Sequence, residues 1–356
     1  MRPVDAVMTF KMLDRRTALG AMGAVAATLA TRPAGAAPRP ALRKPPRLRA
    51  GDVVGLVEPA GFTDDAFDLA LVQDTIRAMG LVPKPGRFVA ARHGYLAGTD
   101  AERAADLNAM YADPEVRAVF AVRGGWGCAR ILPHLDFTAI RKNPKLLIGF
   151  SDITALHLAF AARAGFTTIH GPNAASSWGR FSWDAFRSLV FEGATPVLAN
   201  PAGAEDRLVQ RSGRIRTLTP GTARGRLIGG NLTVLAALMG TPYLPDFDGA
   251  ILFLEDVDEA EYRIDRMLTQ LALAGVLGRL AGVVFGQCTS CRASGPSYGG
   301  FTLSQILEQH LRPLGIPAFQ GAQIGHIANQ FSIPVGAEAE IDAAAGTIRI
   351  LEPVVA

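Results

Sequence analysis

Apolar and polar residues alternate along the first half of the chain in blocks that suit strands and helices. Short unbroken apolar runs predict buried strands, and runs with apolar residues three or four apart predict helices between them. The predicted strands are 52–57, 116–122, 146–150 and 167–169, and the predicted helices are 64–79, 101–112, 129–135 and 152–164. This alternation predicts a largely parallel sheet with helices on both faces.

The pattern changes from about residue 196. Residues 196–222 mix Pro, Gly, Ala and charged residues without strong periodicity, which predicts an interdomain connection between a first domain at 51–195 and a second at 223–356. No internal repeat is visible, and the second domain is predicted to be α/β with more antiparallel character. Its predicted strands are 250–254, 282–285, 339–342 and 347–350, and its predicted helices are 230–239, 260–274 and 302–311.

Composition is that of a globular protein and places the basic charge at one end. The 356 residues are 49% hydrophobic and 19% charged, with a net charge of +4. Residues 1–49 hold ten Lys or Arg and two Asp or Glu, a net charge of +8, so the remainder of the chain carries −4. The predicted domains therefore offer no basic face, and nucleic acid is not an expected partner.

The first 37 residues are expected to be a targeting segment and not part of the fold. Arg15-Arg16 precede a weakly apolar stretch, 18–30, that is too short to span a bilayer as a mature helix. Ala34-Gly35-Ala36 then supply the small residues typical of a cleavage site. The pattern resembles a twin-arginine signal, which predicts export to the periplasm.

Two alternatives to this signal remain open on the sequence. The segment could be a disordered basic tail, or the start codon could lie at Met8 or Met12, although neither restart removes the arginine pair. A non-functional signal would leave the protein in the cytoplasm. Residues 38–50, rich in Pro and Arg, are expected to be a linker. No other stretch reaches the ~18 apolar residues of a membrane span, so no stable membrane insertion is expected after signal cleavage.

Ser151 lies where the apolar run 146–150 ends and a predicted helix begins. A serine at such a corner is exposed at the carboxyl end of a sheet, where the next backbone N–H groups can face a developing oxyanion. Serine is also a common helix N-cap, and the flanks lack the second glycine of the usual hydrolase elbow. The corner alone leaves both interpretations open.

Two further corners lie at strand ends. Arg123-Gly124-Gly125-Trp126-Gly127 follows the strand 116–122, and its glycines can turn N–H groups inward toward an anion, although a plain tight turn or a phosphate loop is the alternative. The segment matches neither a dinucleotide fingerprint nor a P-loop. Glu255 directly follows the apolar strand 250–254 and needs a partner if it is buried. The later acids of this cluster, Asp256 among them, fit a solvated helix start.

Histidine can supply the partner of such an acid. His326 lies in a turn between apolar segments, and His170 closes the strand 167–169. A serine, a histidine and a buried acid form a nucleophile, a base and an orienting group if they converge in space. The other histidines, which lie on predicted helices or in a polar loop, are expected to be structural or superficial: His93, His134, His157 and His310.

The three cysteines do not predict a metal site. Cys288 and Cys291 form a CxxC pair that suits either a disulfide or two idle thiols, and no second pair of zinc ligands lies nearby. Cys128 is expected to be a small buried apolar residue. No cofactor is expected.

Taken together, the motifs resemble the LD-carboxypeptidase family, which includes the microcin C self-immunity peptidases. The agreement spans about residues 50–352. The segments that carry it, in chain order, are Gly51-Asp52-Val53 with Pro59-Ala60, Tyr95-Leu96-Ala97-Gly98-Thr99-Asp100, Arg123 to Gly127, Ile148 to Asp152, Gly229-Gly230-Asn231-Leu232, Leu254-Glu255-Asp256 with Tyr262-Arg263-Ile264-Asp265, and Gly325-His326 with Asn329.

This resemblance implies a fold and a site. The first domain is expected to be Rossmann-like, of the class I glutamine amidotransferase type, and the second a smaller α/β domain of the swivelling β/β/α type. The implied triad is Ser151 as nucleophile, His326 as general base and Glu255 as the orienting acid, with the N–H groups of Gly125 and Asp152 as the oxyanion hole. The implied reaction removes terminal D-alanine from murein tetrapeptides through an acyl-enzyme, without a metal.

Two departures concern the substrate. Trp126 stands where relatives usually have tyrosine, and the export signal differs from the cytoplasmic location of the familiar murein-recycling members. The alternatives are therefore an immunity-type peptidase or amidase and, from another class, a non-catalytic periplasmic binding protein. A homodimer is an expectation from the resemblance alone.

Overall fold

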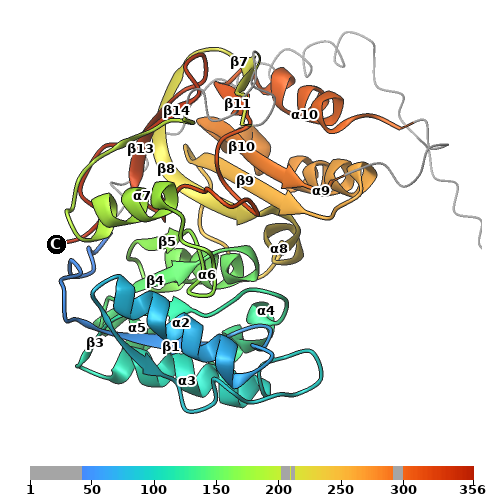
Figure 1. Ribbon diagram of the computed structural model, residues 1–356. Coiled ribbons are helices and arrows are strands. Elements are labelled where there is room, and N and C mark those ends of the chain that lie inside the picture. The colour runs from blue at the N-terminus through green and yellow to red at the C-terminus, as the bar shows by residue number, and fades with distance from the viewer. Residues whose placement is uncertain (1–41, 202–208, 210–212, 292–299) are drawn as a thin grey trace, which may run out of the picture. The chain divides into compact units, whose positions relative to one another are not determined.

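The computed structural model describes residues 42–201, 209, 213–291 and 300–356, and Figure 1 shows the arrangement of their helices and strands. Leu42–Ala356 fall in one compact unit. The predicted signal at 1–37 lies outside the described residues. No helix in the described ranges is long and apolar enough to cross a membrane.

The elements of the first half alternate between strand and helix, as the apolar pattern predicts. They are β1 (Val53–Val57), α2 (Ala66–Ala78), β2 (Val82–Pro85), α3 (Asp100–Ala112), β3 (Val116–Ala121), α4 (Cys128–Ile131), η1 (Leu132–His134), α5 (Phe137–Lys142), β4 (Leu146–Gly149), η2 (Ser151–Ile153), α6 (Thr154–Arg163), β5 (Thr168–His170) and α7 (Arg180–Val190).

The second half is richer in strands. Its elements are β6 (Val197–Leu198), β7 (Arg216–Thr219), β8 (Thr222–Asn231), α8 (Leu232–Ala237), β9 (Ile251–Val257), α9 (Glu261–Leu273), η3 (Leu277–Arg279), β10 (Gly282–Thr289), α10 (Leu303–Leu311), η4 (Arg312–Leu314), β11 (Ala318–Gln320), β12 (Ile333–Val335), β13 (Glu338–Asp342) and β14 (Thr347–Ile350).

The first sheet has six strands in the order β12-β5-β4-β3-β1-β2. Five of them are parallel, and only β12 runs antiparallel, against β5. In parallel α/β sheets, ligands bind at the carboxyl ends of the strands. That edge of this sheet carries Glu58, the segment 123–127 and Ser151, which follow β1, β3 and β4.

The second sheet has eight strands in the order β6-β14-β13-β8-β9-β10-β11-β7. Its central strands β8, β9, β10 and β11 are parallel, and the flanking strands pair antiparallel. The expected mixture of parallel and antiparallel pairing is therefore confirmed. Glu255 lies in β9, and His326 lies in the loop between β11 and β12.

Three segments differ from the expected division of the chain. The region 196–222, expected to be a connection, contributes β6 and β7 to the second sheet. β12, within the expected second domain, pairs with β5 of the first sheet. Part of the expected linker is anchored to the first domain. The N–H of Leu48 donates to the carbonyl oxygen of Val190 at 2.9 Å, and the Leu48 side chain is buried. Such short segments take their conformation from distant partners, which local periodicity does not encode.

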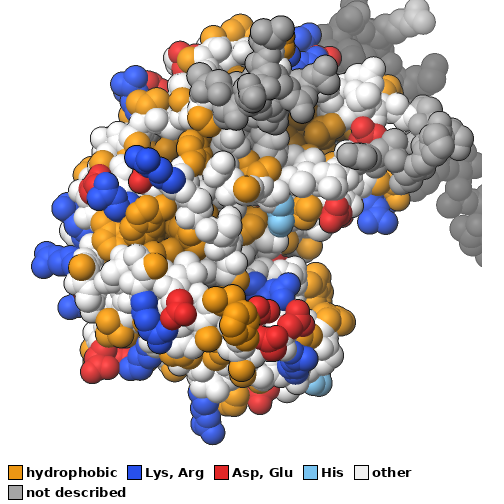
Figure 2. All heavy atoms as spheres, in the orientation of Figure 1, with side chains coloured by type: hydrophobic (Ala, Val, Ile, Leu, Met, Phe, Trp, Pro, Cys, Tyr) orange, Lys and Arg blue, Asp and Glu red, His pale blue; other side chains and the backbone are white. Residues whose placement is uncertain are grey.

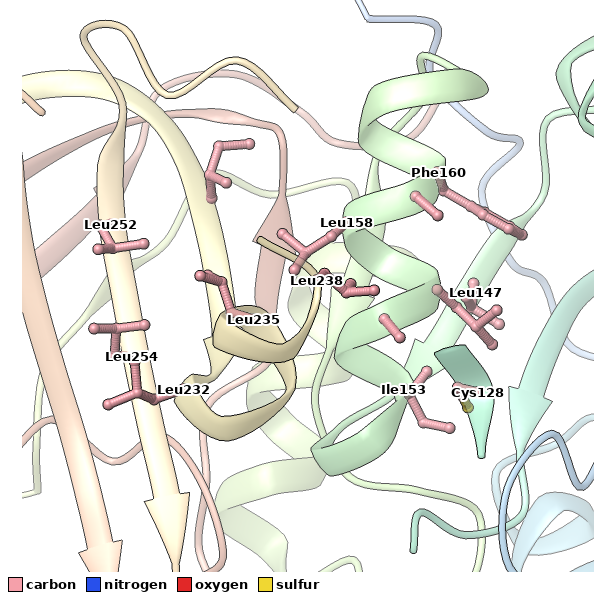
Figure 3. Packing of buried hydrophobic residues seen from close by; sticks show 14 of the residues in the cluster. Cys128, Leu147, Ile153, Leu158, Phe160, Leu232, Leu235, Leu238, Leu252 and Leu254 are labelled. Carbon is pink, nitrogen blue, oxygen red and sulfur yellow. The ribbon is translucent and has the colours of Figure 1, made fainter. Parts of the chain in front are cut away.

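An apolar core joins α6 to the second sheet. Leu158 and Phe160 of α6 belong to the same buried cluster as Leu235 of α8 and Leu252 and Leu254 of β9. Figure 3 shows Leu158 and Leu235 between the helix and the strand, whereas Phe160 points away from the other side of the helix. Because α6 directly follows Ser151 and β9 carries Glu255, this packing fixes the two segments relative to each other.

A second contact pins the start of α6. The backbone N–H of Asn231, at the end of β8, donates to Thr154 Oγ1 at 2.9 Å. The preceding residue, Gly230, has φ +138°, and a Cβ there would collide with the Thr154 side chain. Glycine is thus required for β8 to approach the helix this closely.

Candidate active site

Ser151 sits at a strained corner between β4 and η2. Its φ is +65°, in the left-handed region that non-glycine residues rarely adopt. The N-cap of η2 is Phe150, without a side-chain cap bond, so the alternative that Ser151 is a helix cap is wrong. The corner is held by Asn173, whose Oδ1 accepts the N–H of Phe150 at 3.1 Å. Backbone strain of this kind persists where neighbouring contacts over-determine the conformation, as at a nucleophile elbow.

The glycine turn at 123–127 lies against this corner. A Cβ on Gly124 would stand 2.9 Å from Ser151 Cβ and 3.1 Å from its Oγ, so only glycine fits there. The carbonyl of Gly124 accepts the N–H of Gly61 at 3.1 Å. Since carbonyl and N–H point in opposite directions across a trans peptide, the next N–H, that of Gly125, points away from Gly61.

His326 contacts both of the other expected triad residues. Its Nε2 lies 3.0 Å from Ser151 Oγ, and its Nδ1 lies 2.7 Å from Glu255 Oε2. The loop is anchored by Thr289, whose hydroxyl donates to the carbonyl of His326 at 2.8 Å. The ring also packs on Phe150, with centroids 4.8 Å apart. Serine, histidine and glutamate therefore form one continuous hydrogen-bonded chain.

Burial differs along this chain of three residues. The side chain of Glu255 is 0% exposed, whereas that of His326 is 21% exposed and faces the cleft. A buried carboxylate that pairs with one ring nitrogen fixes the tautomer that leaves the other nitrogen free to accept a proton from serine. Gly325 allows this approach, because a Cβ there would stand 2.6 Å from Glu255 Oε2, and its φ is +111°.

Asp256 differs from its expected place in a solvated helix start. It is the sixth residue of β9 and is buried, and its carboxylate accepts the Thr233 hydroxyl at 2.9 Å and the Asn231 side-chain amide at 3.1 Å. Burial raises the pKa of Asp256 to about 6. The prediction failed because β9 continues beyond the apolar run 250–254 to Val257, and α8 covers the polar end of the strand.

The remaining histidines lie apart from the triad. His170 is fully buried, neither ring nitrogen has a partner among the described residues, and burial holds its pKa well below the ordinary value. His157 is buried in α6 and bonds Thr168 Oγ1 and the Gly149 carbonyl, each at 2.8 Å, which confirms a structural role. His310 pairs with Asp265 at 2.7 Å. His93 forms a turn with Leu96 and His134 ends η1.

The cysteines take up one of the two arrangements left open by the sequence. Cys288 and Cys291 form a disulfide at the end of β10, and Cys128 is buried and free. Within the described ranges, no group of three or more His, Cys, Asp or Glu side chains could hold a metal ion.

A cleft of about 530 Å³ opens beside Ser151 and His326. Its wall includes Arg123, Gly124 and Gly125 from the glycine turn, Asp64 from the loop before α2 and Asp68 from the first turn of α2. Figure 2 shows basic and acidic side chains gathered below the indentation on this face of the molecule. Trp126 is exposed, does not line this cleft, and packs edge to face with Tyr95.

Sequence reasoning gave no role to several residues that shape the site. Glu58 directly follows β1 and Asn173 lies three residues after the end of β5, so both lie at the carboxyl edge of the first sheet, the same signal that singled out Ser151. Burial raises the pKa of Glu58 to about 7, while its bonds to Thr63 oppose the shift. Thr289 gave no local signal, because its contact with His326 joins residues that are 37 apart.

Comparisons with known proteins show the family of the chain. Residues 54–171 match the family model of the LD-carboxypeptidase N-terminal domain, and residues 224–341 match that of the C-terminal domain. The chain is 38% identical over 311 residues to the probable murein peptide carboxypeptidase of Bacillus subtilis, covering 86% of this chain and 94% of that protein. The chain belongs to the LD-carboxypeptidase family.

Solved structures of family members share its fold. The muramoyltetrapeptide carboxypeptidase from Oxalobacter formigenes superposes with a TM-score of 0.71 at 29% identity, over 84% of this chain and 97% of that one. MccF in complex with glutamyl sulfamoyl guanosine superposes with a TM-score of 0.78 at 24% identity, over 89% of this chain and 100% of that one, which shows the shared fold alone. The expected fold class, an α/β protein with a parallel-sheet first domain and a second α/β domain, is confirmed.

Proposed function

We propose that this LD-carboxypeptidase family member is a serine peptidase that removes terminal D-alanine from murein tetrapeptides by cutting the bond after an L-centre. The observation that carries the proposal is the hydrogen-bonded chain from Ser151 through His326 to Glu255, which opens into a cleft. Relatives described as a probable murein peptide carboxypeptidase and a muramoyltetrapeptide carboxypeptidase support the substrate class.

In the proposed mechanism, Ser151 Oγ attacks the scissile carbonyl while His326 Nε2 accepts its proton. Glu255 holds the imidazole through Nδ1 and stabilises the imidazolium that forms. His326 then protonates the leaving D-alanine nitrogen, and the acyl group stays on Ser151. A water molecule, deprotonated by His326, releases the tripeptide.

The proposed oxyanion hole uses the N–H groups of Gly125 and Asp152. The N–H of Asp152 lies in the first turn of η2, where N–H groups have no acceptor within the helix. The N–H of Gly125 points away from Gly61, as the Gly124 carbonyl requires. The turn is tied to the corner by the Asp152 carboxylate, which accepts the N–H of Cys128 at 2.7 Å.

An assay for D-alanine release tests the function. Purified protein should convert a murein tetrapeptide to tripeptide and D-alanine, and Ser151→Ala and His326→Ala should each lower kcat by about 10⁴-fold or more. Full activity in both variants would rule out the triad. Tight binding of the tetrapeptide without turnover by any form would support the binding-protein alternative instead.

The immunity-type alternative has one observation in its favour, the common fold with MccF. A peptide-linked sulfamoyl nucleoside should be offered to the protein in the same assay. Hydrolysis of that compound with a higher kcat/KM than the tetrapeptide would replace the murein assignment.

The cellular location is proposed as the periplasm, on the strength of the Arg15-Arg16 pattern in residues 1–37. A reporter fused to residues 1–40 should be exported, and Arg15→Lys with Arg16→Lys should stop that export. Export that survives both changes would exclude the twin-arginine route. The homodimer remains a proposal, for which light scattering on the purified protein is the direct test.

A further inference from the structure

A carboxypeptidase acts one residue from a chain end, so its cleft must distinguish a free carboxylate from a continuing peptide. The carboxylate carbon of the leaving residue lies within about 4 Å of the scissile carbonyl carbon, given standard backbone geometry. The group that reads this carboxylate must therefore lie close to the nucleophile.

Among the residues that line the cleft in the described part of the chain, Arg123 is the one Lys or Arg side chain. It directly precedes Gly124, whose α-carbon packs against Ser151. Its Nη1 donates to the carbonyl of Phe62 at 2.7 Å, which directs the guanidinium across the Gly61–Phe62 backbone. A guanidinium has five N–H donors, so donors remain for a second acceptor.

No described carboxylate forms an ion pair with Arg123. Neighbouring arginines are engaged elsewhere: Arg130 makes a two-pronged ion pair with Asp100, and Arg92 stacks on the Phe62 ring at 4.3 Å and donates to the Asp64 carbonyl. Glu58 is the buried acid whose pKa Arg123 lowers, but burial outweighs that effect and raises the pKa to about 7. Near neutral pH, Glu58 therefore compensates only part of the positive charge on Arg123.

The acids of the cleft lie on α2 and the loop before it. Asp64 and Asp68 line the same cleft as Arg123 and would repel a carboxylate from their side. The cleft thus has a cationic group next to the glycine turn and an anionic side on the start of α2. This polarity orients a peptide with its free carboxylate toward the glycine turn.

We propose that Arg123 is a specificity-determining residue that binds the C-terminal carboxylate of the substrate and so restricts cleavage to the last residue. Two parallel N–H···O bonds from a guanidinium match a carboxylate in geometry and charge. The proposal rests on the proposed carboxypeptidase function and names the group of that substrate which the cleft recognises.

The test compares two substrates that differ only in charge. They are the murein tetrapeptide with a free D-alanine carboxylate and the same peptide ending in D-alanine amide. Wild-type protein should prefer the acid in kcat/KM by roughly 10- to 150-fold, the range of charge-assisted hydrogen bonds. Arg123→Gln should lose that factor on the acid, stay within about threefold of wild type on the amide, and so abolish the preference, while Arg123→Lys should retain part of it.

Arg130→Gln is the matched control, because Arg130 follows the same glycine turn but pairs with Asp100 and does not line the cleft. It should keep the wild-type ratio of acid to amide. A wild-type enzyme that cleaves both peptides equally, or an Arg123→Gln variant that loses the same factor on both, would overturn the role of Arg123 and leave the carboxypeptidase function standing. Failure of wild-type protein to cleave either peptide would overturn the proposed function, and the role of Arg123 with it.

Discussion

Ser151 Oγ lies 3.0 Å from Nε2 of His326, although 175 residues separate the two in the chain. Neither residue reaches this position by local structure alone. Ser151 is held by the corner after β4 and His326 by the loop after β11. The hydrogen bond therefore depends on the packing of α6 against the second sheet.

Glu255→Gln is predicted to lower kcat by about 10³- to 10⁴-fold while the protein stays folded. The amide keeps the shape of the side chain but loses the charge that stabilises the imidazolium. The amide also introduces an N–H donor beside His326 or at the position of Oε1, which is buried and has no hydrogen-bond partner among the described residues. Steady-state kinetics with the tetrapeptide, and circular dichroism for the fold, measure both effects.

Asp258→Asn is the control for this variant, since Asp258 belongs to the same acid cluster but is exposed, and its φ of +55° is one that asparagine tolerates. It should keep kcat within about twofold of wild type, because an exposed acid away from the reacting groups contributes little to the barrier. Equal losses in both variants would point to a general electrostatic effect and not to orientation by Glu255.

Gly325→Ala is predicted to abolish most activity, because the added Cβ would stand 2.6 Å from Glu255 Oε2 and the backbone φ is +111°. Either Glu255 or the His326 loop must shift, and a misplacement of about 1 Å costs roughly 10²-fold in rate. Gly315→Ala serves as the comparison: it too has positive φ, +65°, but no heavy atom within 4 Å of the new Cβ. Its activity should stay near wild type, and a loss of similar size there would contradict the steric explanation.

His157 links stability to pH. Burial lowers its pKa from 6.5 to about 4, so between these values the unfolded chain binds a proton that the folded protein does not. The neutral His157 therefore contributes to the free energy of unfolding, and this contribution is complete above pH 6.5. As the pH falls toward 4 it is lost by about 1.4 kcal/mol per pH unit. His170 acts in the same direction, whereas Glu58 and Asp256, with raised pKa values, act in the opposite one.

The groups His170, Glu58 and Asp256 are present in both wild type and His157→Gln, so their effects on the pH dependence of stability drop out of the difference between the two proteins. Urea unfolding at several pH values should give a difference in the free energy of unfolding that shrinks by about 1.4 kcal/mol for each unit of acidification below pH 6.5. A difference that does not change with pH would show that His157 is not held neutral by burial.

Thiol labelling tests the cysteine assignment. Native, unreduced protein should take up no iodoacetamide, since Cys288 and Cys291 are joined and Cys128 is buried. Reduction without unfolding should expose the thiols of Cys288 and Cys291, and reduction in denaturant should add that of Cys128. Mass spectrometry distinguishes these states, and labelling of Cys288 or Cys291 before reduction would disprove the disulfide.

Much of the first half of the fold can be predicted from the sequence. The apolar run before Ser151 and the helical spacing after it each reflect a local conformational preference. The position of the corner between β4 and α6 could therefore be predicted from the sequence alone. The identity of Glu255 as a partner-seeking acid follows from the apolar strand before it. These inferences need only short-range periodicity, which burial on one or both faces imposes directly.

What the tertiary structure decided was convergence and backbone strain. Whether Ser151 was a helix cap or a corner residue depended on its φ of +65°, which Asn173 and the glycine turn enforce from outside the local segment. The burial of Asp256 and the pairing of β12 with β5 likewise arise from surfaces brought together by distant chain segments. Sequence determined which groups were present and on what local elements, whereas packing between elements determined which of those groups meet.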